Sequence, residues 1–222
     1  MSSRSRVDRA LHGPSLTEVT IGAAMSVALG ALIGAIYLIG LPVETVREIP
    51  EDAPRHQVYL VEGNQNSAAG GQWMNKRKLL MGGGTFDVRL NEAELNAWIA
   101  RSIVKPAPDD SSAMIKPKSI NFRIHDGLLQ IGMPCDLDLF GFFGQELVLQ
   151  ARGDFAPDGT HFVFEPKEFM IGSLAAHRVP GLTSLVLPRL MHTDDGPEEL
   201  VAAWDRLENV RIEDDSLVLT LR

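Results

Sequence analysis

A run of 25 residues without a charged side chain, residues 19–43, constrains this chain of 222 residues more than any other feature. In a helix, which rises 1.5 Å per residue, this run is longer than the ~30 Å hydrocarbon core of a bilayer, so it can cross a membrane with some tilt. A helix on the surface of a soluble core would show a polar face, and this run shows none. We therefore expect a transmembrane helix over residues 16–43.

A cleaved signal peptide is the competing interpretation of this run. The apolar region of such a peptide usually covers ~7–15 residues and ends in small residues at a cleavage site. Here the run is longer, has neither an A-x-A pattern nor a cysteine for lipid attachment, and ends in Leu-Pro-Val-Glu. Ser15 and Glu18 fit a capping box at its start, and Pro42 can end the helix. The pattern indicates an uncleaved signal anchor.

The charges on the two flanks predict the orientation of this anchor. Arg4, Arg6 and Arg9 precede it against Asp8 alone, whereas the stretch that follows is acidic. The positive-inside rule then makes residues 1–15 a cytoplasmic tail and places residues 44–222 outside the cytoplasm. We expect a single-pass protein of the cell (inner) membrane with an extracytoplasmic, or periplasmic, body.

Small residues recur at every fourth position of the anchor, at Gly22, Ser26, Gly30 and Gly34. Such a row lets two helix backbones approach closely, so it is a candidate packing face for a second copy or for another membrane helix. The alternative is ordinary composition, because glycine is frequent in membrane spans.

The remaining body is acidic and lacks the usual signatures of chemistry. The net charge of the chain is −8, which argues against nucleic acid as a partner. The single Cys135 excludes an internal disulfide and a cysteine-rich zinc site. The six histidines form no ligand pair, and there is no nucleophile elbow or phosphate loop. Asp136 and Asp138 share a strand face, for which a solvated surface is the simpler interpretation than a cation site. We expect no cofactor, no metal and no enzyme.

Residues 44–84 have the composition of a tether and a membrane-proximal segment. Glycines flank a short helical stretch that contains Lys76, Arg77 and Lys78, the one basic cluster of the body. This cluster is either a solvated helix face or a contact for anionic headgroups, because the tether would keep it near the bilayer.

From residue 85 onward, strand and helix patterns alternate. A strand with period two leads into a helix over residues 92–104, capped by Asn91. Asp126-Gly127 and Asp214-Asp215 indicate hairpins. Most strands have one apolar and one polar face, which is typical of an antiparallel sheet covered on one side. We expect residues 85–222 to form an α+β domain, a curved antiparallel sheet packed on one face by helices.

Two sets of apolar residues are candidates for binding. Leu129, Ile131, Leu147 and Leu149 point to one side of two long strands and could line an apolar channel. Phe142 and Phe143 lie at a turn, where Asn, Asp and Gly are usual. Their rings either fold back on the core or form an apolar tip for a lipid or a partner protein.

Several stretches between residues 85 and 222 resemble the YpmS-like family of single-span proteins with an extracytoplasmic domain. The matching stretches are VRLNEAELNAWI, the strand into LDLFG, LVLQARGDFAPDG and KEFMIGSLAAHRVPGL. That family is distantly similar to tubular lipid-binding proteins, in which a curved sheet around a long helix encloses an apolar groove. The resemblance implies a location and an architecture, and it carries no catalytic residues.

Two functions of different class follow as hypotheses. In the first, the external domain binds an apolar or lipid-like ligand or scaffolds other envelope components. In the second, the chain is a structural subunit of a membrane complex, with no ligand and no catalytic activity. The interior between sheet and helices discriminates them, because large aromatic side chains would fill it in a structural protein, whereas a connected channel would favour lipid.

Overall fold

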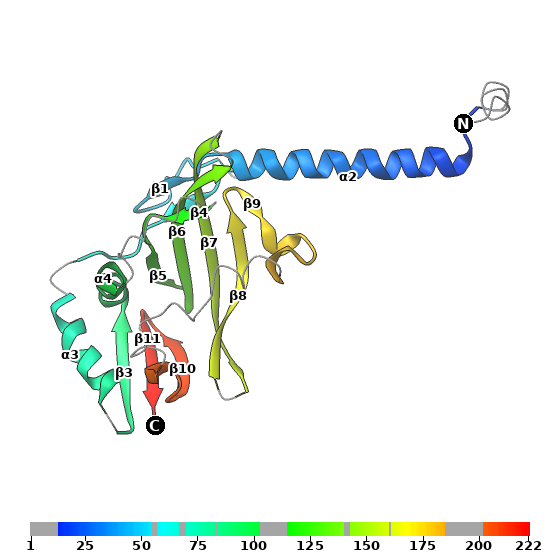
Figure 1. Ribbon diagram of the computed structural model, residues 1–222. Coiled ribbons are helices and arrows are strands. Elements are labelled where there is room, and N and C mark those ends of the chain that lie inside the picture. The colour runs from blue at the N-terminus through cyan, green and yellow to red at the C-terminus, as the bar shows by residue number, and fades with distance from the viewer. Residues whose placement is uncertain are drawn as a thin grey trace. The chain divides into compact units, whose positions relative to one another are not determined.

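The structure, a computed structural model, describes residues 13–54, 57–66, 70–82, 84–102, 115–139, 143–159, 161–184 and 202–222 (Figure 1). Within these ranges, only the backbone is described for residues 70, 101–102, 115–116, 137–139 and 143–145. The chain divides into two compact units, residues 1–39 and 40–222, and each is described by itself.

The first unit is dominated by the apolar helix α2, Leu16–Gly40, none of whose residues is buried. It is long and apolar enough to cross a membrane, as expected. The capping box at its start is confirmed: the backbone N of Glu18 donates to Oγ of Ser15, and the backbone N of Ser15 donates to Oε2 of Glu18, both at 3.2 Å. The helix ends at Gly40, two residues before Pro42.

Two antiparallel sheets form the body, which confirms the α+β class (Figure 1). The larger sheet has the strand order β4-β6-β7-β8-β9, and β5 also pairs with β6. The smaller sheet has the order β10-β11-β3. The strands are β3 (Phe86–Asn91), β4 (Ile115–Pro117), β5 (Asn121–His125), β6 (Leu128–Leu139), β7 (Phe143–Asp158), β8 (His161–Ile171), β9 (Leu174–Ala175), β10 (Leu207–Glu213) and β11 (Ser216–Leu221).

The two hairpins expected from the sequence are present. Asp126 and Gly127 join β5 to β6 with φ of 52° and 66°, the left-handed values that a tight two-residue connection needs. Asp214, with φ of 51°, turns β10 into β11. Both turns therefore set the register of the strands that they join.

Helices and one small strand pair complete the body. These elements are β1 (Glu44–Val46), β2 (Tyr59–Val61), α3 (Gly70–Met81), α4 (Glu92–Ser102) and the short 3-10 helix η1 (Ala176–Arg178). β1 and β2 pair in parallel, with Val46 opposite Val61. The stretch expected as a tether thus contains a strand that pairs inside the body.

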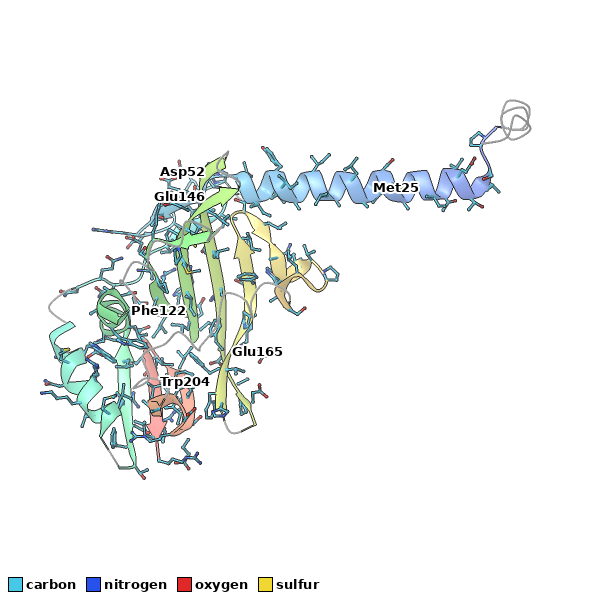
Figure 2. All side chains as sticks on the ribbon, in the orientation of Figure 1. Met25, Asp52, Phe122, Glu146, Glu165 and Trp204 are labelled. Carbon is cyan, nitrogen blue, oxygen red and sulfur yellow. The ribbon has the colours of Figure 1, made fainter. Side chains whose placement is uncertain are left out.

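The core is a cluster of aliphatic side chains, to which the two sheets and the helices α3 and α4 also contribute aromatic rings. The rings of Trp73 and Trp98 have centroids 5.2 Å apart, and those of Phe155 and Phe164 are 5.7 Å apart. Phe122 and Trp204 pack against the same cluster (Figure 2). The buried members of the cluster are Trp73, Leu80, Val88, Leu90, Leu95, Ile124, Leu129, Phe164, Leu207, Val210, Leu217, Leu219 and Leu221.

The segment before residue 85 contributes directly to this packing. Trp73 and Leu80 on α3 are 2% and 4% exposed, and Leu60 on β2 is 2% exposed. One face of α3 carries Trp73, Lys76 and Leu80, but only two of these three side chains are apolar. The periodicity of the sequence is therefore a weak indication that this face is buried. Residues 40–222 form a single compact unit, with no division at residue 85.

Candidate functional site

The four residues expected to line an apolar channel share one face of the larger sheet. The register places Ile131 opposite Ala151, Met133 opposite Leu149 and Cys135 opposite Leu147. Leu129 belongs to the buried core cluster, and Ile131 packs against that cluster. Leu147 and Leu149 lie farther along the same face and are buried there. The structure therefore divides the set into two pairs along the strands.

The pair Leu147 and Leu149 lies within an aliphatic region around Cys135. Cys135 has no exposed surface, and Leu149 is opposite Ile171 on β8. Burial, with a smaller contribution from the charge of Asp136, raises the pKa of the Cys135 thiol to about 11. The thiol stays protonated at neutral pH, so Cys135 acts as a buried hydrophobic side chain.

The opposite face of the larger sheet carries a polar row under β2. Asn121, Gly132 and Gln150 are neighbours across β5, β6 and β7, and a Cβ at residue 132 would overlap Cδ1 of Leu60. The absence of a side chain at Gly132 thus makes room for β2. Oδ1 of Asn121 accepts from the backbone N of Gly63 at 2.8 Å, which fixes the chain just after β2.

Side chains of α4 bind the outer edge of β5. Asn96 accepts from the backbone N of Phe122 at 2.7 Å and donates to its O at 2.8 Å, while Glu92 accepts from the backbone N of Ile124 at 2.7 Å. Glu92 and Asn96 also bind the backbone of Asn64, at 2.9 and 3.1 Å. The backbone groups of Phe122 and Ile124 at this edge of the sheet are therefore hydrogen-bonded by side chains. Covering an edge in this way is a common protection against pairing with another chain. In the sequence, the only sign of this contact is the spacing of four residues between Glu92 and Asn96, which places both on one face of a helix.

Helix α3 is held to the body by polar contacts as well as by Trp73. Nζ of Lys76 lies 2.6 Å from Oε1 of the fully buried Glu94. Nη2 of Arg206 donates to the main-chain O of Leu80 at 2.8 Å and so satisfies a carbonyl in the last turn of α3. These contacts fix both the rotation and the end of the helix.

The outer face of the smaller sheet carries a network of ion pairs. Arg211 bonds Glu213 at 2.6 Å and Asp87 at 3.3 Å, and Arg89 bonds Glu213 at 2.6 Å. The hydroxyl of Thr220 donates to Asp87 at 2.7 Å and, with Arg211, holds the pKa of Asp87 below its ordinary value. Arg211 lowers the pKa of Glu213 in the same way. Each carboxylate is stabilised in its charged form, the opposite of what a general acid needs at neutral pH.

The described residues contain no group of three or more His, Cys, Asp or Glu side chains that could hold a metal ion. Asp136 forms an ion pair with Lys118 at 2.8 Å, and this contact, with the nearby Glu146, raises the pKa of Lys118. His125 and His161 lie near Asp126 and Asp205, both at 3.4 Å on the exposed surface. The side chain of Asp138 lies outside the described residues.

The two remaining sets of candidate residues are placed only in part. Gly22, Ser26, Gly30 and Gly34 all lie on α2, where Oγ of Ser26 donates to the main-chain O of Gly22 at 2.9 Å. That bond stays within the helix. Phe142 lies outside the described residues, and Phe143 begins β7 with its side chain outside the described part. Packing through the glycine row and contact through the phenylalanine tip therefore stay predictions.

Three comparisons bear on the family of this chain. No family model, no curated protein and no solved structure matches it. The resemblance to the YpmS-like family stays a prediction from the sequence.

Proposed function

We propose that this chain is a single-pass membrane protein whose body lies outside the cytoplasm and acts as a scaffold for other envelope components. The observation that carries the proposal is α2, a predominantly apolar helix of 25 residues, none of which is buried. A helix of that kind is stable in water only at a high cost of exposed apolar surface, so a bilayer is its natural surrounding.

The filled interior of the body supports a scaffold over a carrier of lipid. The ring pairs Trp73–Trp98 and Phe155–Phe164 belong to the same core cluster as Leu129, so they occupy space that a lipid channel lined by Leu129 would need. A shallow hollow on the described surface is lined by residues 179–182 and Ser184, and none of the four expected lining residues borders it. Rings in this position leave less space for an acyl chain, so they favour the scaffold over a lipid carrier.

A second candidate function, binding of a lipid-like ligand, rests on Leu147 and Leu149. These residues are buried near Cys135 and are not members of the core cluster that contains Trp73 and Phe164. An acyl chain packs well against aliphatic side chains of this kind. A purely structural subunit without a ligand differs from the scaffold only in its set of partners.

Native mass spectrometry of the full chain, extracted from its own membrane with a mild detergent, separates these functions. A scaffold is expected to keep a partner protein in fixed ratio and to release lipid as the detergent is removed in the gas phase. Retention of one lipid per chain, lost in Leu149→Arg and kept in the exposed control Val163→Arg, would establish the ligand-binding function instead. Bare monomer without a partner under all conditions would contradict the scaffold.

A further inference from the structure

The stretch that connects α2 with β2 contributes little to the core. Among residues 41–54, all of which the structure describes, none is buried, and Ile49 is 59% exposed. Leu60 and Val61 on β2 are, by contrast, 2% and 4% exposed. Burial of apolar surface therefore holds β2 on the body but gives the residues before it little stability.

Polar bonds also hold β2 and the residues just after it to the body. The backbone N of Gly63 donates to Oδ1 of Asn121 at 2.8 Å, and the next backbone N, that of Asn64, donates to Oε2 of Glu92 at 2.9 Å. Separation of this segment from the body would break both bonds and would expose Leu60. β2 is therefore a fixed element of the body.

β1 is joined to β2 by a short parallel ladder. The ladder covers three residue pairs, the first of which is Glu44 with Tyr59, and the backbone N of Glu62 donates to the main-chain O of Val46 at 2.9 Å. None of the three side chains of β1 is buried. Parallel pairing is slightly less stable per residue than antiparallel pairing, and two strands alone are marginally stable in water. Elements with so few buried contacts open locally at a low cost in free energy.

We propose that β1 is a releasable strand that sets the length of the tether between the anchor and the body. While β1 is paired, the free tether is residues 41–43, which span at most ~14 Å between Gly40 and Glu44. After release of β1, with β2 still in place, the free tether is residues 41–58, which span at most ~68 Å between Gly40 and Tyr59. This inference rests on the proposed membrane anchoring. For a scaffold, two tether lengths allow the body to bind envelope components at two distances from the bilayer.

Hydrogen exchange of single backbone amides tests the release, in the full chain with one copy per lipid nanodisc. The amide of Glu62 is bonded to β1, whereas the amides of Gly63 and Asn64 are bonded to side chains of the body. After correction for intrinsic rates, Glu62 is expected to exchange at least about tenfold faster than the other two, which should stay protected. Equal protection of all three amides would show that β1 does not open by itself, and fast exchange of all three would show that β2 opens with it. Either result would overturn the proposal.

A disulfide between the two strands supplies the matched comparison. Glu44→Cys with Tyr59→Cys places cysteines at paired positions of neighbouring strands, a separation that a disulfide can bridge. Oxidation of this variant is expected to slow the exchange of Glu62 at least about tenfold, and reduction should reverse the effect. Tyr59→Cys alone, oxidised in the same way, should leave the exchange fast, since the native Cys135 is buried.

Equal exchange of Glu62 in the oxidised and reduced forms of the double variant would also overturn the proposal. Gel filtration shows whether each variant stays in the nanodisc. Failure of the anchor is thereby distinguished from failure of β1 to open.

Discussion

The ammonium of Lys76 lies 2.6 Å from a carboxylate oxygen of Glu94, a side chain with no exposed surface. The same ammonium donates to the main-chain O of Arg89 at 2.6 Å, and Glu94 accepts from the backbone N of Asn91 at 3.0 Å. One ion pair therefore joins α3, the end of β3 and the first turn of α4. Residues on both sides of position 85 depend on each other through it.

Truncation tests this dependence. A fragment of residues 41–222 is expected to be soluble and to melt cooperatively, because residues 40–222 form one compact unit. A fragment of residues 85–222 lacks Trp73, Leu80 and Lys76 and should aggregate or melt without a cooperative transition. A fragment that starts at Glu51 lacks β1, the partner of β2, and should melt below the first fragment. Calorimetry compares the three, and equal transitions for all would show that the membrane-proximal segment is separate from the core.

Substitution of Lys76 by Met in the fragment 41–222 leaves the carboxylate of Glu94 buried without its partner. Breaking a buried pair from one side costs roughly 3–5 kcal/mol. We expect the free energy of unfolding, measured by urea denaturation, to decrease by about 3 kcal/mol. This is the lower end of the range, because Lys76 keeps 27% of its side-chain surface exposed.

Lys78→Met serves as the control for this substitution, because it makes the same chemical change at an exposed position of α3. Its free energy of unfolding should stay within about 0.5 kcal/mol of that of the unsubstituted fragment. Adding Glu94→Gln to Lys76→Met should restore part of the stability, since no buried charge remains. Equal urea midpoints for Lys76→Met and Lys78→Met would contradict the role of the ion pair.

Two glycines test close approaches of backbone segments. A Cβ at residue 153 would overlap the main-chain O of Glu165 on β8, and a Cβ at residue 63 would overlap the main-chain O of Phe122. Because backbone atoms cannot move aside as side chains do, Gly153→Ala and Gly63→Ala should each destabilise the fragment by about 2 kcal/mol or more. Gly71→Ala on α3 meets no atom within 4 Å and should be neutral or slightly stabilising. Thermal melts of the three variants check this order of stability.

The ion network on the smaller sheet predicts a loss of stability in acid. Asp87 and Glu213 have pKa values below the ordinary ones, chiefly through the bonds from Thr220 and Arg211 respectively. A carboxyl whose pKa is lowered by folding adds stability above its unfolded pKa, and this stability is lost as the pH falls through the folded pKa. The urea concentration at the midpoint of unfolding should therefore decrease as the pH is lowered below the range where free carboxyls titrate. Arg211→Gln should reduce this acid dependence, and an unchanged profile in that variant would argue against the network.

Local patterns predicted much of the fold because the deciding forces act within a few residues. The hairpin at Asp126-Gly127 could be predicted because these two residues readily adopt the left-handed conformation that its turn needs. Helix α4 could be predicted from its apolar stripe, which buries Leu95 and Ile99. The long charge-free run predicted α2 by the same reasoning. This prediction depends on the apolar character of each residue in the run and on no contact with a distant part of the chain. The expected helix over residues 92–104 begins at Glu92, as α4 does.

The candidate site was harder to predict because its determinants are contacts across the chain. The absence of a side chain at Gly132 leaves room for Leu60, which lies 72 residues earlier in the sequence. For the basic cluster that contains Lys76, the sequence left a solvated helix face or a contact with headgroups, and only the approach of Glu94 makes Lys76 the partner of a buried carboxylate. No periodicity reveals which distant backbone will lie on a given residue.

Thiol labelling of the membrane-bound chain tests the anchor and its orientation most directly. Single cysteines at Lys167 in the body and at Ser5 in the tail are probed with a membrane-impermeant maleimide in intact spheroplasts, with the buried Cys135 left in place. The account predicts that Lys167→Cys is labelled at once, that Ser5→Cys is labelled only after permeabilisation, and that alkaline carbonate leaves both proteins in the membrane. Labelling of the tail with protection of the body, or release of the chain by carbonate, would contradict it.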